Sequence, residues 1–222
     1  MLQTKSRNIS MDIIRCTALL LVISVHFFLN SGFYDKPLAG GRMYLMTLMR
    51  STFMICVPLF LLLSGYLMSG KKLNKRYYFG LGKTVGIYLL ASIACLVYRT
   101  VFLHEPFTWG DSFYSLLNFS AAPYAWYIEM YLGLFLLIPF LNAAYHGLSS
   151  KKQKQVLLLT MVILTAAPAI CNLYKKILPA WWTSLYPVAY YFIGCYLKEF
   201  RPKIKKSVGI LLLAGIGELT RV

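Results

Sequence analysis

The sequence predicts an all-α membrane protein, a polytopic bundle of transmembrane helices, and three observations support this class. Apolar residues make up 59% of the 222 residues and charged residues only 14%, against about 45–50% and 25% in soluble domains. The mean hydropathy is +0.61. Long apolar segments alternate with short clusters of basic residues, which is the arrangement typical of chains that cross a membrane several times.

Six segments are apolar and long enough to form complete spans, and a seventh begins near Ser207. The seventh reaches Val222 with Glu218 and Arg221 near its end, so we expect one membrane-embedded domain over residues 1–222 that is incomplete at its C-terminus. The six complete spans are predicted at residues 11–30, 43–68, 83–103, 125–145, 155–174 and 184–197.

The distribution of the basic residues predicts the orientation of the chain. The net charge is +16, and most of the 23 lysines and arginines lie in the leader and after the second, fourth and sixth spans. This is the positive-inside pattern, which puts the N-terminus in the cytoplasm and indicates topology, not nucleic-acid binding. The connection 104–124 falls on the opposite side and is long enough to fold over a membrane face.

The cysteines indicate neither a metal site nor a disulfide framework. The five cysteines are widely scattered and mostly lie in apolar segments, without a Cys-x-x-Cys pair or a Cys/His cluster. We therefore expect thiols within the membrane, no metal and no bound cofactor.

The first span carries ionisable side chains at unusual depth. Arg15 and His26 are eleven residues apart, which is about 1,100° of helix, so they lie within about 20° of each other and about 16 Å apart along the axis. Asp12, three residues before Arg15, is close enough to pair with it. Ionisable groups at membrane depth normally face a bundle interior or a wet cavity, so this helix is expected to line one.

A simpler interpretation stays open for both residues. Arg15 could extend to the cytoplasmic interface with Asp12 as its partner, and His26 could be an interfacial histidine at the other end of the span.

Two further spans carry polar candidates. Glu129 lies inside the fourth predicted span beside Trp126, where an unpaired carboxylate in hydrocarbon would be costly and should face the cavity. Alternatively, Glu129 is solvated near the interface. Ser64 and Tyr66 follow Pro58 in the second span, where serine and glycine more often allow helices to pack closely.

Four motifs together resemble the acyltransferase-3 family of integral membrane acyltransferases. The first is Arg15, ten intervening residues and His26, on a span that opens with Met11-Asp12. Three later motifs follow in order: VPLFLLLSGYL at residues 57–67, WYIEMYLGL at 126–134 with IPFL at 138–141, and YYFIGCYL at 190–197. The combination is more specific than any one of them.

The resemblance implies a reaction and its partners. It implies transfer of an acyl group, usually acetyl, from cytoplasmic acyl-CoA to a hydroxyl of a cell-envelope carbohydrate, in a bacterial cytoplasmic membrane. Acyl-CoA is then the donor substrate, and membrane lipid and an envelope glycan are the partners. Family members typically have more spans than this chain offers.

The resemblance assigns the catalytic role to His26. The pKa of an ordinary histidine is about 6.5, so it can take the hydroxyl proton near neutral pH as a general base, although covalent acyl-histidine transfer is the open variant. Arg15 could hold a coenzyme A phosphate or stabilise charge. The expected substrate-binding residues are Asp12, Ser64, Tyr66, Trp126 as a sugar-stacking platform, and Glu129.

Two other classes of protein remain as alternatives. A secondary transporter or flippase would use intramembrane Arg15, His26 and Glu129 equally well, although the halves show no related pair of Gly/Pro-interrupted spans. A non-catalytic membrane scaffold fits if the chain cannot form its cavity.

Overall fold

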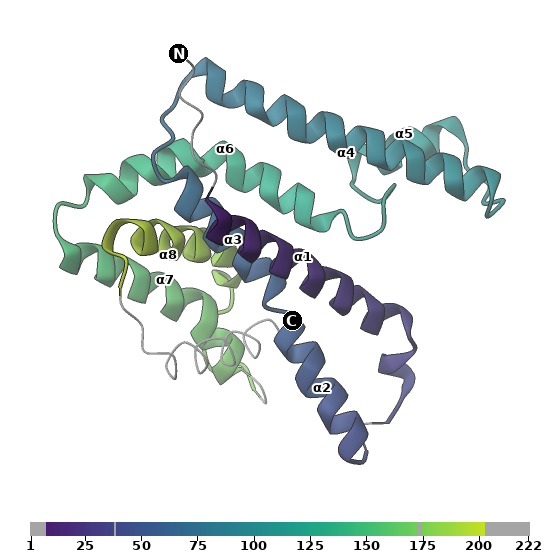
Figure 1. The fold of residues 1–222 in the computed structure, drawn as a ribbon, viewed down its shortest axis with the longest axis horizontal. Helices are drawn as coiled ribbons and strands as arrows, with labels where there is room; N and C mark the ends of the chain where they lie inside the picture. The colour runs from purple at the N-terminus through teal and green to yellow at the C-terminus, as the bar shows by residue number, and fades with distance from the viewer. Residues whose placement is uncertain (1–7, 38, 173–174, 203–222) are drawn as a thin grey trace. The chain divides into compact units, whose positions relative to one another are not determined.

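A computed structural model describes residues 8–37, 39–172 and 175–202, and all regular structure within them is helical (Figure 1). The all-α class predicted from the composition is therefore confirmed for the described residues. These helices form two compact units, one made of the described residues up to Ser69 and from Leu148 onward and the other comprising Gly70–Gly147.

The first unit combines helices from both ends of the chain. In chain order they are α1 (Ile9–Asn30), the 3₁₀ helix η1 (Phe33–Asp35), α2 (Gly41–Phe53), α3 (Cys56–Met68), α7 (Lys151–Cys171), the 3₁₀ helix η2 (Thr183–Leu185) and α8 (Tyr186–Phe200). The second unit consists of α4 (Lys75–Val101), α5 (Trp109–Leu117) and α6 (Trp126–Gly147).

Five of the six predicted complete spans correspond to helical stretches long and apolar enough to cross a membrane. These are Ile9–Asn30, Gly41–Met68, Lys75–Val101, Trp126–Gly147 and Lys151–Cys171. The sixth predicted span corresponds to α8, whose 15 residues give about 22 Å of helix, less than a hydrocarbon core of about 30 Å. The sixth span and the cytoplasmic N-terminus stay predictions, and the seventh segment lies outside the described residues.

Two spans begin earlier than the sequence predicted, because N-terminal caps place basic residues inside the helices. Asn74 accepts a hydrogen bond from the backbone N–H of Tyr77, which starts α4 eight residues before the predicted position. Ser150 and Gln153 form a reciprocal capping box at the start of α7. The lysines expected before the fifth span therefore lie in its first turn.

The second predicted span is not one continuous helix, because it breaks between Phe53 and Cys56. Pro58 has no N–H to donate to the carbonyl of Met54 four residues earlier, and its ring crowds that carbonyl. The Cys56 thiol approaches this carbonyl at 3.9 Å, and the ladder resumes with Leu59 N–H donating to Ile55.

The tightest contact in the first unit is a crossing of α3 and α8 at two glycines. A methyl group placed on Gly65 would lie 2.0 Å from the carbonyl oxygen of Tyr191, and one placed on Gly194 would lie 2.2 Å from that of Leu62. The Cys195 thiol donates to the carbonyl of Gly65 at 3.5 Å. The two backbones therefore touch directly, which only residues without a side chain permit.

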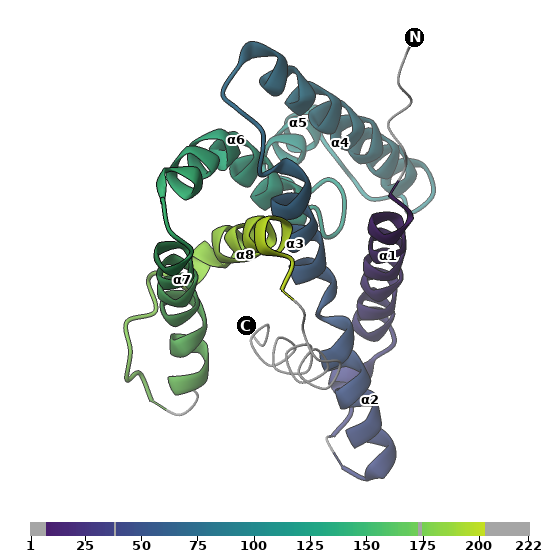
Figure 2. The same ribbon diagram turned by 60° about the vertical axis from the view of Figure 1, so that its left-hand side comes forward.

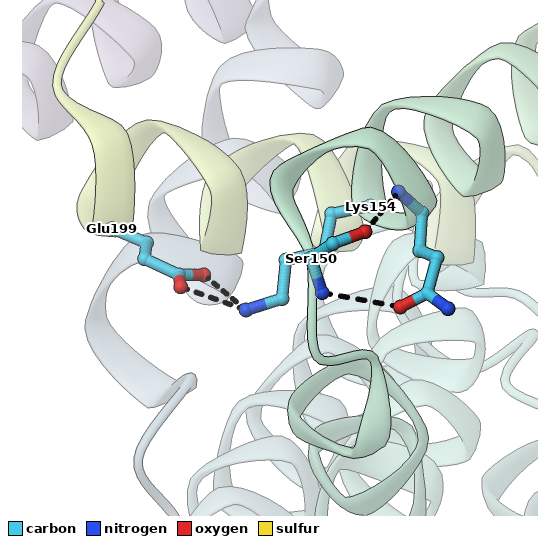
Figure 3. A network of polar contacts seen from close by, with 4 residues as sticks. Ser150, Lys154 and Glu199 are labelled. Atoms are coloured by element: carbon cyan, nitrogen blue, oxygen red, sulfur yellow. Dashed lines mark hydrogen bonds and ion pairs between the residues drawn. The ribbon is translucent and has the colours of Figure 1, made fainter.

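An ion pair ties α7 to α8 (Figure 3). Nζ of Lys154 lies 2.7 and 2.9 Å from the two carboxylate oxygens of Glu199. The Lys154 side chain is only 8% exposed, whereas that of Glu199 is 37% exposed. A buried ammonium needs such a partner, because leaving it uncompensated is costly.

Aromatic packing and a buried hydrogen bond hold α4 against α6 in the second unit. The rings of Tyr77 and Phe135 stack at 4.4 Å, and the Tyr77 hydroxyl donates to the carbonyl of Phe135. Tyr127 and Tyr131 continue the row along α6 at helical spacing. The fourth apolar segment predicted from the sequence is thus a helix, α6, with this row as its packed face.

The connection 104–124 is not an irregular loop throughout, since it contains α5. A capping box between Thr108 and Asp111 starts this helix, and the hydrogen bonds from Thr108 hold the pKa of the Asp111 carboxyl below its usual value. At the end of α4, Arg99 binds Glu105 through two nitrogens at 2.9 and 2.6 Å.

The α3–α8 crossing predicts that Gly194→Ala destabilises the protein by about 1–3 kcal/mol or more, because a methyl group overpacks the backbone contact. Gly86→Ala in α4 is the matched control, since a methyl group there meets nothing within 4 Å. Thermal unfolding in detergent checks both variants. Equal melting temperatures for Gly194→Ala and Gly86→Ala would contradict the crossing.

The ion pair predicts that Lys154→Met lowers stability, because it removes the ammonium that binds the Glu199 carboxylate. The loss should be smaller than the about 3–5 kcal/mol of a fully buried pair, because Glu199 is partly exposed. The double variant Lys154→Met/Glu199→Leu should recover most of it, and Lys152→Met, an exposed lysine of the same turn, should change little. Additive losses in the double variant would show that the two residues are not coupled.

Candidate functional site

The first helix places Arg15 and His26 as the sequence predicts. Both residues lie in one uninterrupted α-helix, α1, so their separation of eleven residues puts them on one face, about 16 Å apart along the axis. A guanidinium and an imidazole are thus aligned along a single helix.

Asp12 and Arg15 form the expected ion pair. Nη1 of Arg15 lies 2.9 Å from Oδ1 of Asp12, and the two side chains are 51% and 24% exposed. The pair orients the guanidinium while half of its surface stays open. A planar group with five N–H donors can hold a phosphate or carboxylate in that position.

His26 lies in the last part of α1 and is half-buried. Its backbone carbonyl accepts a hydrogen bond of 2.8 Å from the side-chain amide of Asn30. Phe28, Phe33 and Met43, contributed by α1, η1 and α2, form the core of an apolar cluster. The packed apolar cluster therefore lies at the end of the span that carries His26.

Ser64 and Tyr66 flank Gly65 at the α3–α8 crossing, and both are half-buried. The Ser64 hydroxyl donates to the carbonyl of Phe60 in its own helix at 2.9 Å. The packing interpretation of this segment therefore applies to Gly65, whereas Ser64 and Tyr66 lie on either side of the contact. Figure 2 shows α1 and α3 of this unit side by side, and these helices carry five of the expected site residues.

Trp126 and Glu129 belong to the second unit. They occupy the first turn of α6, three residues apart and therefore on one face, and both are exposed. A carboxylate is stabilised at a helix N-terminus by the helix dipole. This arrangement pairs a flat apolar ring with a hydrogen-bond acceptor, a combination that suits a polyol.

The surroundings of the site include one hollow along α1 and no cluster of metal ligands among the described residues. An open hollow of about 400 Å³ lies along α1 beside Asp12, lined by Ile9, Asp12, Ile13, Cys16, Thr17 and Leu20. Within the described residues, no three His, Cys, Asp or Glu side chains gather in a way that could hold a metal ion, and the five cysteines are free.

Sequence reasoning missed two structural partners of the site. Gly194 was not recognised as the partner of Gly65, although small residues within both apolar segments are the signal for such a contact. Tyr77 was not recognised as the residue that packs α4 on α6. The spacing of Tyr127, Tyr131 and Phe135 indicates an aromatic face that packs against another helix.

The helices and their polar side chains define a multi-pass membrane protein with a candidate site built on helical spans. A family described as an acyltransferase domain, Acyl_transf_3, matches residues 8–217, so the chain belongs to this family of acyltransferases. No curated protein and no solved structure matches the chain. Family membership confirms the resemblance drawn from the four motifs.

Proposed function

We propose that the protein is a membrane O-acyltransferase that moves an acyl group, acetyl in the simplest case, from acyl-CoA to a hydroxyl of a cell-envelope carbohydrate. The observation that carries the proposal is the family match over residues 8–217 together with Arg15 and His26 on one face of α1. We place the reaction in a bacterial cytoplasmic membrane, with the amino terminus and the donor on the cytoplasmic side.

His26 acts as the general base in this mechanism. It takes the proton of the acceptor hydroxyl as that oxygen attacks the thioester carbonyl carbon. The new C–O bond forms, the C–S bond breaks, and the proton passes from His26 to the departing thiolate, which leaves as free coenzyme A. The protein thus returns to its starting protonation state after each transfer.

Arg15 binds an anionic group of the donor. Coenzyme A carries its phosphates at one end of an extended arm and the thioester at the other. A guanidinium and an imidazole about 16 Å apart on one helix can therefore contact both ends of one donor molecule. Asp12 holds Arg15 in place through the ion pair at 2.9 Å.

Trp126 and Glu129 of the second unit bind the acceptor. The indole of Trp126 stacks on the apolar face of a sugar ring, while the Glu129 carboxylate accepts hydrogen bonds from its hydroxyls. Ser64 and Tyr66 offer further hydroxyl groups on α3. No bound cofactor takes part, because the donor brings the acyl group itself.

The role of His26 predicts that His26→Ala lowers the transfer rate by about 10²–10⁴-fold, since general-base assistance is lost. The protein is reconstituted in lipid vesicles with radiolabelled acetyl-CoA and a bacterial envelope glycan extract, and label in the glycan is counted. His146→Gln, an exposed histidine at the end of α6, is the control and should retain full activity. Glycan label that survives His26→Ala would sink the mechanism.

The role of Arg15 predicts a different kinetic signature. Arg15→Ala should raise KM for acetyl-CoA at least about tenfold, which corresponds to about 1.4 kcal/mol of lost binding, while Arg15→Lys should recover part of the loss. Initial rates at varied acetyl-CoA check this. An unchanged KM with a lowered kcat would instead place Arg15 in the chemical step.

Proton-coupled transport is the competing activity. Label that never reaches the glycan, combined with acyl-independent flux of a solute driven by a pH gradient across the vesicles, would favour a transporter or flippase over the proposed enzyme.

A further inference from the structure

The connection between α4 and α6 folds back along α4. Tyr88 is the central residue of α4, thirteen residues from either end. Its hydroxyl donates to the carbonyl of Leu116, in the last turn of α5, at 2.9 Å. The rings of Tyr88 and Phe119 lie 4.6 Å apart. Since thirteen residues of helix measure about 20 Å, the C-terminal end of α5 lies far from the Val101 end of α4 and close to its midpoint.

The contacts between α4 and α6 show independently that the connection returns to the middle of α4. Tyr77, near the start of α4, donates to Phe135, and Asn142 farther along α6 donates to Lys71, which precedes α4, at 2.8 Å. The two helices are therefore antiparallel, as Figure 1 also shows. Trp126 lies nine residues before Phe135, about 13 Å back along α6, which brings the start of α6 level with the middle of α4.

Several backbone groups of the turn that joins α5 to α6 are hydrogen-bonded within the protein. The carbonyl of Ser115 accepts hydrogen bonds from the N–H groups of Ser120 and Ala121, both at 3.0 Å, and Asn118 accepts from Ser120 at 3.1 Å. Ala121 is completely buried. Irregular backbone is tolerated at membrane depth only where protein or a water-filled cavity satisfies it in this way.

The composition of the segment suits hydrocarbon. No charged residue occurs between Asp111 and Glu129. Trp109, Phe113 and Leu117 follow one another at intervals of four residues on one face of α5, and all three are exposed. Such an apolar face matches lipid chains better than water.

We propose that residues 102–125 form a re-entrant hairpin that enters the membrane beside α4 and starts α6 level with the middle of that helix. The first turn of α6, with Trp126 and Glu129, then lies within the membrane, where a carboxylate needs water or a polar ligand. The depth of the hairpin does not rest on the proposed function.

A depth series along α5 tests the hairpin. Three proteins each carry one tryptophan: native Trp109, Phe113→Trp or Leu117→Trp, with every other tryptophan replaced by phenylalanine. Each protein is reconstituted in phosphatidylcholine vesicles brominated near the headgroup, halfway along or near the end of the acyl chains. References of known position on α4 are Leu90→Trp near its midpoint and Phe102→Trp just past its end, since both side chains are exposed.

A re-entrant hairpin predicts a gradient of quenching depth along α5. The strongest quenching should move deeper from residue 109 to 113 to 117, by up to about 6 Å for each four residues, and residue 117 should match Leu90→Trp. If one substitution disturbs the fold, the remaining two depths still define the slope. Equal shallow depths resembling Phe102→Trp, or quenching by aqueous iodide alone, would overturn the hairpin. Failure of acyl transfer would leave the depth series unchanged and would count only against the proposed function.

Discussion

The direct contact of α3 with α8 at Gly65 and Gly194 is the constraint on which the first unit depends. It joins a helix from the first third of the chain to one close to its end, and α1 and α7 pack on this pair in turn. Lipid chains are as apolar as helix surfaces, so close backbone packing, rather than hydrophobic burial, holds helices together in a membrane. The position of the helix that carries Arg15 and His26 therefore depends on two residues that lack a side chain.

The ion pairs of this protein lie mostly where the free-energy cost of placing an ion in a membrane is lowest. The pairs Asp12–Arg15, Arg99–Glu105 and Lys154–Glu199 lie near helix ends, where snorkelling and interfacial water reduce the cost of an ion. His26 lies farther along its span, in the last part of α1, whereas Glu129 lies in the first turn of α6.

The second unit changes the interpretation of the long connection. The connection 104–124, which is long enough to fold over a membrane face, returns along α4 to its middle, where the Tyr88 hydroxyl donates to the carbonyl of Leu116. Trp126 and Glu129 consequently lie in the first turn of α6, level with the middle of α4.

The sequence by itself determined the all-α membrane class, the approximate position of five spans and the family, because hydropathy and motif spacing are properties of local segments. It also determined the shared face of Arg15 and His26, since helical periodicity alone sets it. Tertiary structure decided the break before Pro58, the earlier starts of α4 and α7, the partner of Gly65 and the return of residues 102–125 along α4. Caps, backbone contacts and hydrogen bonds such as that from Tyr88 to Leu116 join residues according to their arrangement in space, and hydropathy along the chain carries no record of those pairs.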